Sequence, residues 1–327
     1  MIQSKFNRTF LLLIVLLGLI LLSLSSGEIR IEFKDVILSL FGKSTSYNNS
    51  LIQNLRLPRI LGGAAIGAAL SISGLLTSTA LKNPLADSGI LGIQSGATVG
   101  ALITLLLLPS LTNILPLFSF AGGLVAFILL LIITTSSSGF KPGKIVLVGV
   151  AINSIGTSII GIITILNVYK LRDAITWLSG SLVTITKSQM GIILIYTGIF
   201  ILISYFLIPV LKVLLLEDSG IINLGYNPVF LRIIVSLIAV MLASIGVAFS
   251  GVISFIGIIA PQLAKRIVGQ NLTYLLPCSA VIGGVLIVTT DLFQKIVFSP
   301  MEIPVGILIG VLGAPLFIVL AKGEQNG

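Results

Sequence analysis

The sequence contains no histidine and a single cysteine, Cys278, among 327 residues. The absence of histidine removes the commonest metal ligand and the usual proton shuttle. One cysteine excludes an internal disulfide, and its apolar surroundings favour a buried, unreactive thiol. A phosphate loop of the G-x-x-x-x-G-K-[ST] type and a serine–base arrangement are also absent from the sequence. We therefore expect neither an enzyme nor a protein with a resident metal or cofactor.

Charged residues are scarce as well. They make up 9% of the chain, whereas a soluble domain carries about 25%. Together with the 56% of hydrophobic residues and a mean hydropathy of +1.19, this composition indicates an all-α integral membrane protein. The net charge of +9 fits loops that face anionic lipid, and no basic surface suited to nucleic acid is visible. No charge-rich stretch is long enough for a soluble domain, so we expect one polytopic domain over residues 1–327.

Apolar runs near the length that a bilayer requires predict about ten membrane helices. The first, over residues 10–24, follows Lys5 and Arg8. We interpret it as a retained helix with a cytoplasmic N-terminal end, although a signal peptide has a similar pattern. A polar outside loop over 27–55 should follow, with a short amphipathic helix at 31–41. The remaining spans are predicted over 58–81, 90–108, 114–135, 144–167, 190–211, 229–250, 252–268, 276–297 and 303–321.

Residues 56–100 are the most informative stretch. Arg56-Leu-Pro-Arg59 stands before a charge-free run over 60–81 whose small residues recur at helical spacing. Such residues let a neighbouring membrane helix approach closely. The run ends at Lys82 and breaks at Asn83-Pro84, because proline removes a donor and clashes within a helix. A charged rim, a closely packed span and a broken helix are typical of a transport pathway more than of an anchor.

Acidic residues within the predicted spans are almost absent, and only Asp291 lies clearly inside an apolar run. We interpret Asp291 as a buried polar link to a neighbouring helix. Carriers driven by ion gradients usually keep ionisable groups near the middle of the membrane. If this protein transports, we therefore expect its energy to come from a partner subunit.

The cytoplasmic segment at about 213–228 carries Glu217, Asp218 and Ser219, which suit a helix N-terminus, and then Gly225 and Pro228, which end a helix and begin the next. The segment is either a plain connection or a lever for a motor subunit.

Several motifs occur in order along nearly the whole chain: Arg56-Leu-Pro-Arg59, Asn83-Pro-Leu-Ala-Asp87, Gly89-Ile-Leu-Gly-Ile-Gln-Ser-Gly96, Trp177-Leu-Ser-Gly-Ser-Leu182, Leu224-Gly-Tyr226, Gly251-Val-Ile-Ser-Phe-Ile-Gly-Ile-Ile-Ala-Pro261, Glu302-Ile-Pro-Val-Gly306 and Gly313-Ala-Pro-Leu-Phe317. Together they resemble the FecCD-type permeases, the membrane subunits of importers for iron–siderophores, haem and cobalamin. The resemblance implies a ten-helix subunit of the bacterial cell membrane, similar to the cobalamin-importer permease.

The resemblance also implies partners. A second permease copy or a paralogue would complete a central pathway, an ATP-binding-cassette ATPase dimer would dock on the cytoplasmic side, and a binding protein would dock outside. In this family, basic residues at the positions of Arg56, Arg59 and Lys295 receive glutamates of the binding protein. Lysine stands at 295 where arginine is familiar, so a bidentate fork is lost while the charge remains.

On the cytoplasmic side, Leu224, Gly225 and Tyr226 match the segment that couples to the ATPase. Asn83 and Leu85 match residues that close the pathway there. Gln262 departs from the histidine that relatives usually carry after the proline, which should matter little if the position is structural.

On the span over 144–167, Asn153 and Thr157 share a helix face with Ser154 and Ser158. Polar residues at this spacing either face the pathway or form hydrogen bonds between helices.

The resemblance favours a ferric-siderophore importer, with haem or cobalamin as the close alternatives. An ion-gradient-driven carrier and a membrane scaffold without transport activity are the other classes left open.

Overall fold

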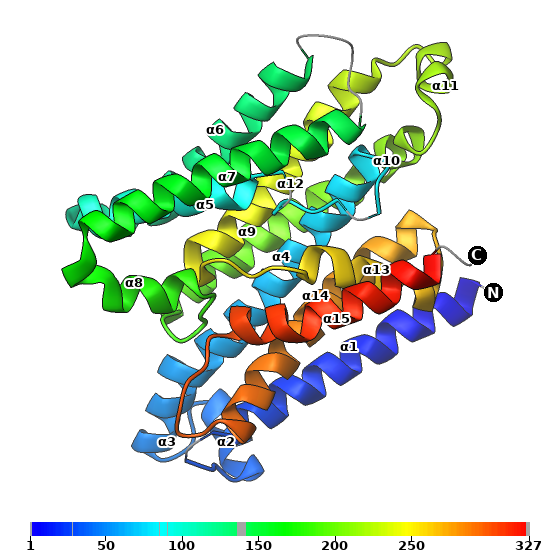
Figure 1. Ribbon diagram of the computed structural model, residues 1–327. Helices are drawn as coiled ribbons and strands as arrows, with labels where there is room; N and C mark the ends of the chain where they lie inside the picture. The colour runs from blue at the N-terminus through cyan, green and yellow to red at the C-terminus, as the bar shows by residue number, and fades with distance from the viewer. Residues whose placement is uncertain (1, 28, 85, 90, 136–141, 325–327) are drawn as a thin grey trace.

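The computed structural model describes residues 2–324 except 28, 85, 90 and 136–141. The described residues form a bundle of helices and contain no β-strand (Figure 1), which confirms the all-α expectation. The α-helices are α1 Ile2–Ser25, α2 Phe33–Leu40, α3 Ser46–Leu51, α4 Leu57–Ala80, α5 Ile93–Leu102, α6 Leu115–Thr135, α7 Pro142–Leu166, α8 Leu171–Leu178, α9 Lys187–Phe206, α10 Ile208–Leu214, α11 Asp218–Asn223, α12 Pro228–Ser250, α13 Ile256–Val268, α14 Leu272–Val297 and α15 Val305–Glu324.

Short helices of other types continue some of these elements. The π-helix η1, Ile52–Arg56, leads directly into α4, and the π-helix η2, Ile103–Leu107, extends α5. The 3-10 helices are η3, Pro109–Ile114, and η4, Val168–Lys170.

Helix α4 lies at the centre of the bundle and packs against α9, α12, α13 and α14. Its small residues explain this position. A Cβ atom built on Gly67 would lie 2.2 Å from the carbonyl oxygen of Gly283 in α14, and one on Gly74 would lie 1.8 Å from that of Gly257 in α13. Only glycine permits these backbone contacts, so the predicted close packing of this span is confirmed.

Seven helices of the described chain are long and apolar enough to cross a membrane. The predicted span over 252–268 differs from the structure, because residues 251–255 are not helical and α13 has only 13 residues. A helix of that length rises about 20 Å, which is less than the hydrocarbon core of a bilayer. The chain turns at Gly251, with a φ of 71°, where a Cβ atom would meet the carbonyl oxygen of Trp177 at 1.7 Å.

The two ends of the bundle are distinct. Both termini and α11 lie on the right of Figure 1, whereas α2 and α3 lie at the lower left. Arg8 near the start of α1 donates to the carbonyl of Ile267 at the end of α13, over 2.7 Å. With the N-terminal end placed in the cytoplasm as predicted, the end with α11 is the inner end and that with α2 and α3 is the outer end. The predicted amphipathic helix over 31–41 corresponds to α2.

Candidate functional site

At the outer end, Arg59 in the first turn of α4 holds three side chains at once. Its Nε donates to Asp291 over 2.8 Å, its Nη2 to Gln294 over 2.9 Å and its Nη1 to Glu302 over 2.7 Å. Asp291 and Gln294 belong to α14, and Glu302 lies in the segment between α14 and α15. The guanidinium fork therefore joins the start of α4 to α14 and to the segment that follows α14, more than two hundred residues later in the sequence.

Asp291 pairs with a second cation. The Nζ atom of Lys295, one turn further along α14, lies 2.6 Å from its Oδ2. The Asp291 side chain is 2% exposed, and a buried carboxylate requires such partners to remain charged. The interpretation of Asp291 as a buried link between helices is confirmed. Arg59, Asp291, Lys295 and Glu302 are called the outer charge cluster below.

Arg56 lies beside this cluster but has different partners. It donates to the carbonyls of Leu24 and Ile29, the first over 2.6 Å. It is buried and packs beneath Gly27. Arg56 thus ties the end of α1 and the following loop to the start of α4, a structural task that the sequence did not reveal.

The three predicted docking residues are brought together by the fold. Arg56, Arg59, Lys295 and Glu302 all line one cavity of about 260 Å³. Lys295 also lines an adjoining cavity of about 490 Å³ together with Arg30. Basic side chains outnumber acidic ones around this mouth, so it can attract acidic groups from outside.

At the inner end, Asp218 forms the second charge cluster. It begins α11 and receives hydrogen bonds from Arg232 in α12 over 2.7 and 3.0 Å. Lys82, two residues after the end of α4, approaches it to 3.2 Å. Arg232 also donates to the carbonyl of Ala80, the last residue of α4, over 3.2 Å. The inner charge cluster of Asp218, Arg232 and Lys82 therefore fastens α11 to α12 and to the end of α4.

Two opposing effects act on the Asp218 carboxyl. Partial burial raises its pKa, but the hydrogen bonds from Arg232 and Lys82 outweigh burial, so its pKa lies below the usual value. Asp218 is therefore ionised at neutral pH and keeps both cations as partners.

The predicted coupling residues follow α11 directly. Leu224 is 56% exposed and Tyr226 is 53% exposed. Gly225 has a φ of 82° with no atom within 4 Å of a built Cβ atom, so the turn requires glycine for its conformation and leaves space around it. Exposed apolar side chains outside the long spans can bury surface against another protein.

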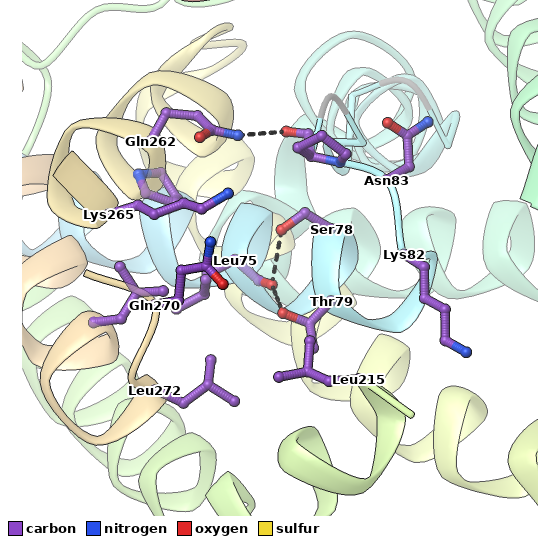
Figure 2. A pocket seen from close by; sticks show the side chains of 13 residues that line it. Leu75, Ser78, Thr79, Lys82, Asn83, Leu215, Gln262, Lys265, Gln270 and Leu272 are labelled. Carbon is purple, nitrogen blue, oxygen red and sulfur yellow. Dashed lines mark hydrogen bonds between the residues drawn. The ribbon is translucent and has the colours of Figure 1, made fainter. Parts of the chain in front are cut away.

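Of the predicted gate residues, Asn83 lines an inner cavity of about 350 Å³, whereas Leu85 lies outside the described residues. Figure 2 shows this cavity between the end of α4 and α13. Across it, Gln262 donates to the carbonyl of Pro84 over 3.2 Å. Gln262 thus holds the break after α4 against α13, which is a structural role for this position.

Asn153 and Thr157 are exposed on α7, together with Ser154 and Ser158. The Thr157 hydroxyl donates to the Asn153 carbonyl over 2.8 Å. This hydrogen bond lies within α7 itself. The opposite face of α7 packs inward, where Gly156 meets Ser95 of α5.

Sequence reasoning missed the partners of the predicted residues. It did not identify Glu302, Gln294, Arg232 or Lys82 as members of charge clusters. The available signal was the scarcity of charge itself, because a charged residue at the edge of an apolar run usually has a partner.

Comparison with known proteins agrees with this architecture. Residues 12–322 match the model of the FecCD transport family. Over the full chain, the sequence is 35% identical to a protein of Staphylococcus aureus strain MSSA476 named "Probable heme-iron transport system permease protein IsdF", of which 99% is covered. A solved structure described as "An inward-facing conformation of a putative metal-chelate type ABC transporter" superposes with a TM-score of 0.86 and 25% identity, covering 97% of this chain and 99% of that one.

A second solved structure, PsaBC from Streptococcus pneumoniae in complex with Fab, shares the fold with a TM-score of 0.54 and 14% identity, over 88% of this chain and 95% of that one. The expected family, the cell-membrane location and the absence of a catalytic role in this subunit are confirmed by the family match. The chain belongs to the FecCD transport family and is a multi-pass permease subunit of an ABC importer, a type that works with ATPase and binding-protein partners.

Proposed function

We propose that this chain, with a second permease copy, forms the membrane pathway for an iron chelate, and that haem is the first substrate to test. The name of the S. aureus relative, which is similar over the whole chain, supports haem. The description of the similar solved structure supports a metal chelate more generally. Ferric siderophores, favoured by the sequence, remain the second candidate within the same chemical class.

The observation that carries the mechanism is that the two charge clusters stand at opposite ends of one helix. Helix α4 has 24 residues and so spans about 36 Å. Arg59 lies in its first turn, and the Ala80 carbonyl at its end accepts from Arg232. In the proposed mechanism, α4 carries a displacement at one end to the other as a rigid element.

Outside, the mouth lined by Arg56, Arg59 and Lys295 would receive acidic side chains of the binding protein. Charge complementarity of this kind accelerates encounter and orients the partner. Arg30, which the sequence did not single out, lines the adjoining cavity and is exposed, so we add it to the docking surface.

Inside, Leu224, Gly225 and Tyr226 would dock on the ATPase. Movement of α11 on ATP binding would pull on Asp218 and, through the inner charge cluster, on the end of α4 beside Asn83. That end would open or close the pathway together with Leu85. The exposed polar face of α7 with Asn153 and Thr157 would line the pathway opposite the second copy.

The test is uptake by proteoliposomes that contain this permease with its co-purified ATPase and binding protein. In proteoliposomes whose ATPase faces the lumen, we expect ATP in the lumen to drive accumulation of ⁵⁵Fe-labelled haem there. Accumulation of a ferric siderophore but not haem would transfer the assignment to the second candidate. Uptake driven by a proton or sodium gradient without ATP would contradict the proposed mechanism.

The docking surface is best tested with neutral substitutions. Arg59→Glu would place a new acid beside the buried Asp291 and disturb the fold. Arg59→Gln removes the charge and leaves Lys295 as a partner for Asp291. We expect Arg59→Gln to weaken binding of the binding protein, whereas Lys43→Gln, at an exposed site in the loop after α2, should not.

A further inference from the structure

Arg59 is shared by two acids that differ sharply in their surroundings. Asp291 is 2% exposed, whereas Glu302 is 51% exposed. Both lie within salt-bridge distance of the same guanidinium, at 2.8 and 2.7 Å. One partner of Arg59 therefore belongs to the interior and the other to the outer surface.

The two pairs also differ in how easily they exchange. Asp291 has a second cation in Lys295, and separating a buried carboxylate from its partners leaves an uncompensated charge. An exposed ion pair shifts an equilibrium by about five-fold at most, because water and salt replace it readily. Glu302 is thus the exchangeable partner of Arg59, and Asp291 is the fixed one.

Glu302 is also held at the cavity mouth. It lines the same 260 Å³ cavity as Arg56, Arg59 and Lys295. Its segment is fastened beside the cluster by Gln294, whose amide donates to the carbonyl of Met301 over 3.4 Å. An acidic side chain that reached Arg59 from outside would meet Glu302 already in place.

We propose that the Glu302 carboxylate occupies the site on Arg59 at which a carboxylate of the docking partner binds, and that the partner's carboxylate displaces it. This inference rests on the proposed docking of an acidic binding protein. Glu302 lowers the net gain on docking, since one ion pair is exchanged for another. The Arg59–Glu302 pair therefore lowers the affinity of the permease for the binding protein, so that the binding protein dissociates after it has released its substrate.

The test measures the dissociation constant of the co-purified binding protein for the permease–ATPase complex in nanodiscs. We expect Glu302→Gln to tighten binding, by up to about five-fold, and to slow dissociation. The gain should shrink as salt is raised, because exposed charges are screened. In the double variant Arg59→Gln/Glu302→Gln the gain should vanish, since there is no guanidinium left to release.

The matched control is Glu32→Gln. Glu32 is exposed in the outer segment and forms no cap hydrogen bond with its side chain. The Glu32→Gln substitution removes the same charge from the same side of the membrane, so it measures the general electrostatic effect. Thermal melting of each complex verifies that the variants are folded.

The outcomes separate this inference from the docking proposal. If Glu302→Gln binds no more tightly than Glu32→Gln while Arg59→Gln weakens binding, Glu302 is not a competitor and the inference is overturned. If Arg59→Gln leaves binding unchanged, the docking proposal itself is contradicted.

Discussion

Replacement of Asp218 by asparagine should weaken the attachment of α11 to the rest of the permease. The aspartate accepts two hydrogen bonds from Arg232 and approaches Lys82. Charge-assisted hydrogen bonds contribute about 1.5–3 kcal/mol each. Asp218 is 46% exposed, and solvent reduces exposed pairs to about 0–1 kcal/mol. We therefore expect a loss of about 1–2 kcal/mol in the attachment of α11.

A loss of that size changes the ratio of attached to detached α11 by about 5- to 30-fold. The amide protons of α11 should then exchange with solvent faster by the same factor, as measured by mass spectrometry in nanodiscs. ATP hydrolysis should continue while uptake per ATP falls, because the pull on α4 is lost. Glu217→Gln is the matched control, since this exposed neighbour forms no cap hydrogen bond with its side chain. Unchanged exchange in Asp218→Asn would refute the assignment of this cluster as a mechanical link.

The same link should depend on pH in a defined direction. The pKa of Asp218 is lowered in the folded protein, because its hydrogen bonds with the two cations outweigh the effect of burial. Attachment of α11 is therefore complete above the usual aspartate pKa of about 4, and is lost only as pH falls through the lowered value. A loss of hydrogen-exchange protection in α11 between pH 8 and pH 6 would contradict this direction.

Other substitutions test the packing and the two ends of the molecule. Gly74→Ala should lower the melting temperature by several degrees, because its Cβ atom would lie 1.8 Å from a carbonyl oxygen of Gly257 and overpacking costs about 1–3 kcal/mol. Gly191→Ala, with nothing within 4 Å, should not lower it. Asp291→Asn should destabilise the detergent-solubilised chain by about 3–5 kcal/mol, since Lys295 loses its charged partner and Arg59 keeps only the exposed Glu302; an unchanged melting temperature would refute this role. Tyr226→Ala should reduce uptake per ATP hydrolysed and leave melting unchanged, and an unaltered ratio would count against the coupling segment.

Much of the fold follows from apolar run length, because a bilayer demands long helices of apolar residues. The residues at 251–255 show where that signal fails. They are as apolar as a membrane helix, yet the chain turns there at Gly251 and Phe255, both with positive φ. Hydropathy records the environment of a residue and not its backbone conformation, so the shortened α13 could not be predicted.

The candidate site was predictable to a different extent. The gathering of Arg56, Arg59 and Lys295 followed from the family resemblance, and the buried link formed by Asp291 followed from its position in an apolar run. The bond of Arg56 to main-chain carbonyls and the pairing of Arg59 with Glu302 depend on loops that meet only after folding. Arg56 lies 32 and 27 positions from its two carbonyl partners, and Arg59 lies 243 positions from Glu302, and the periodicity of the sequence does not indicate contacts across such separations.

The most direct test of the account maps both docking surfaces on the unmodified permease. Hydrogen exchange is measured in nanodiscs with the binding protein added, with the ATPase added, and with neither. We predict that the binding protein protects peptides containing Ile29 and Glu302, and that the ATPase protects peptides containing Ile221 and Tyr226. The assignment of the outer charge cluster as the docking site would be contradicted if one partner protected both sets of peptides, or if the binding protein protected neither set.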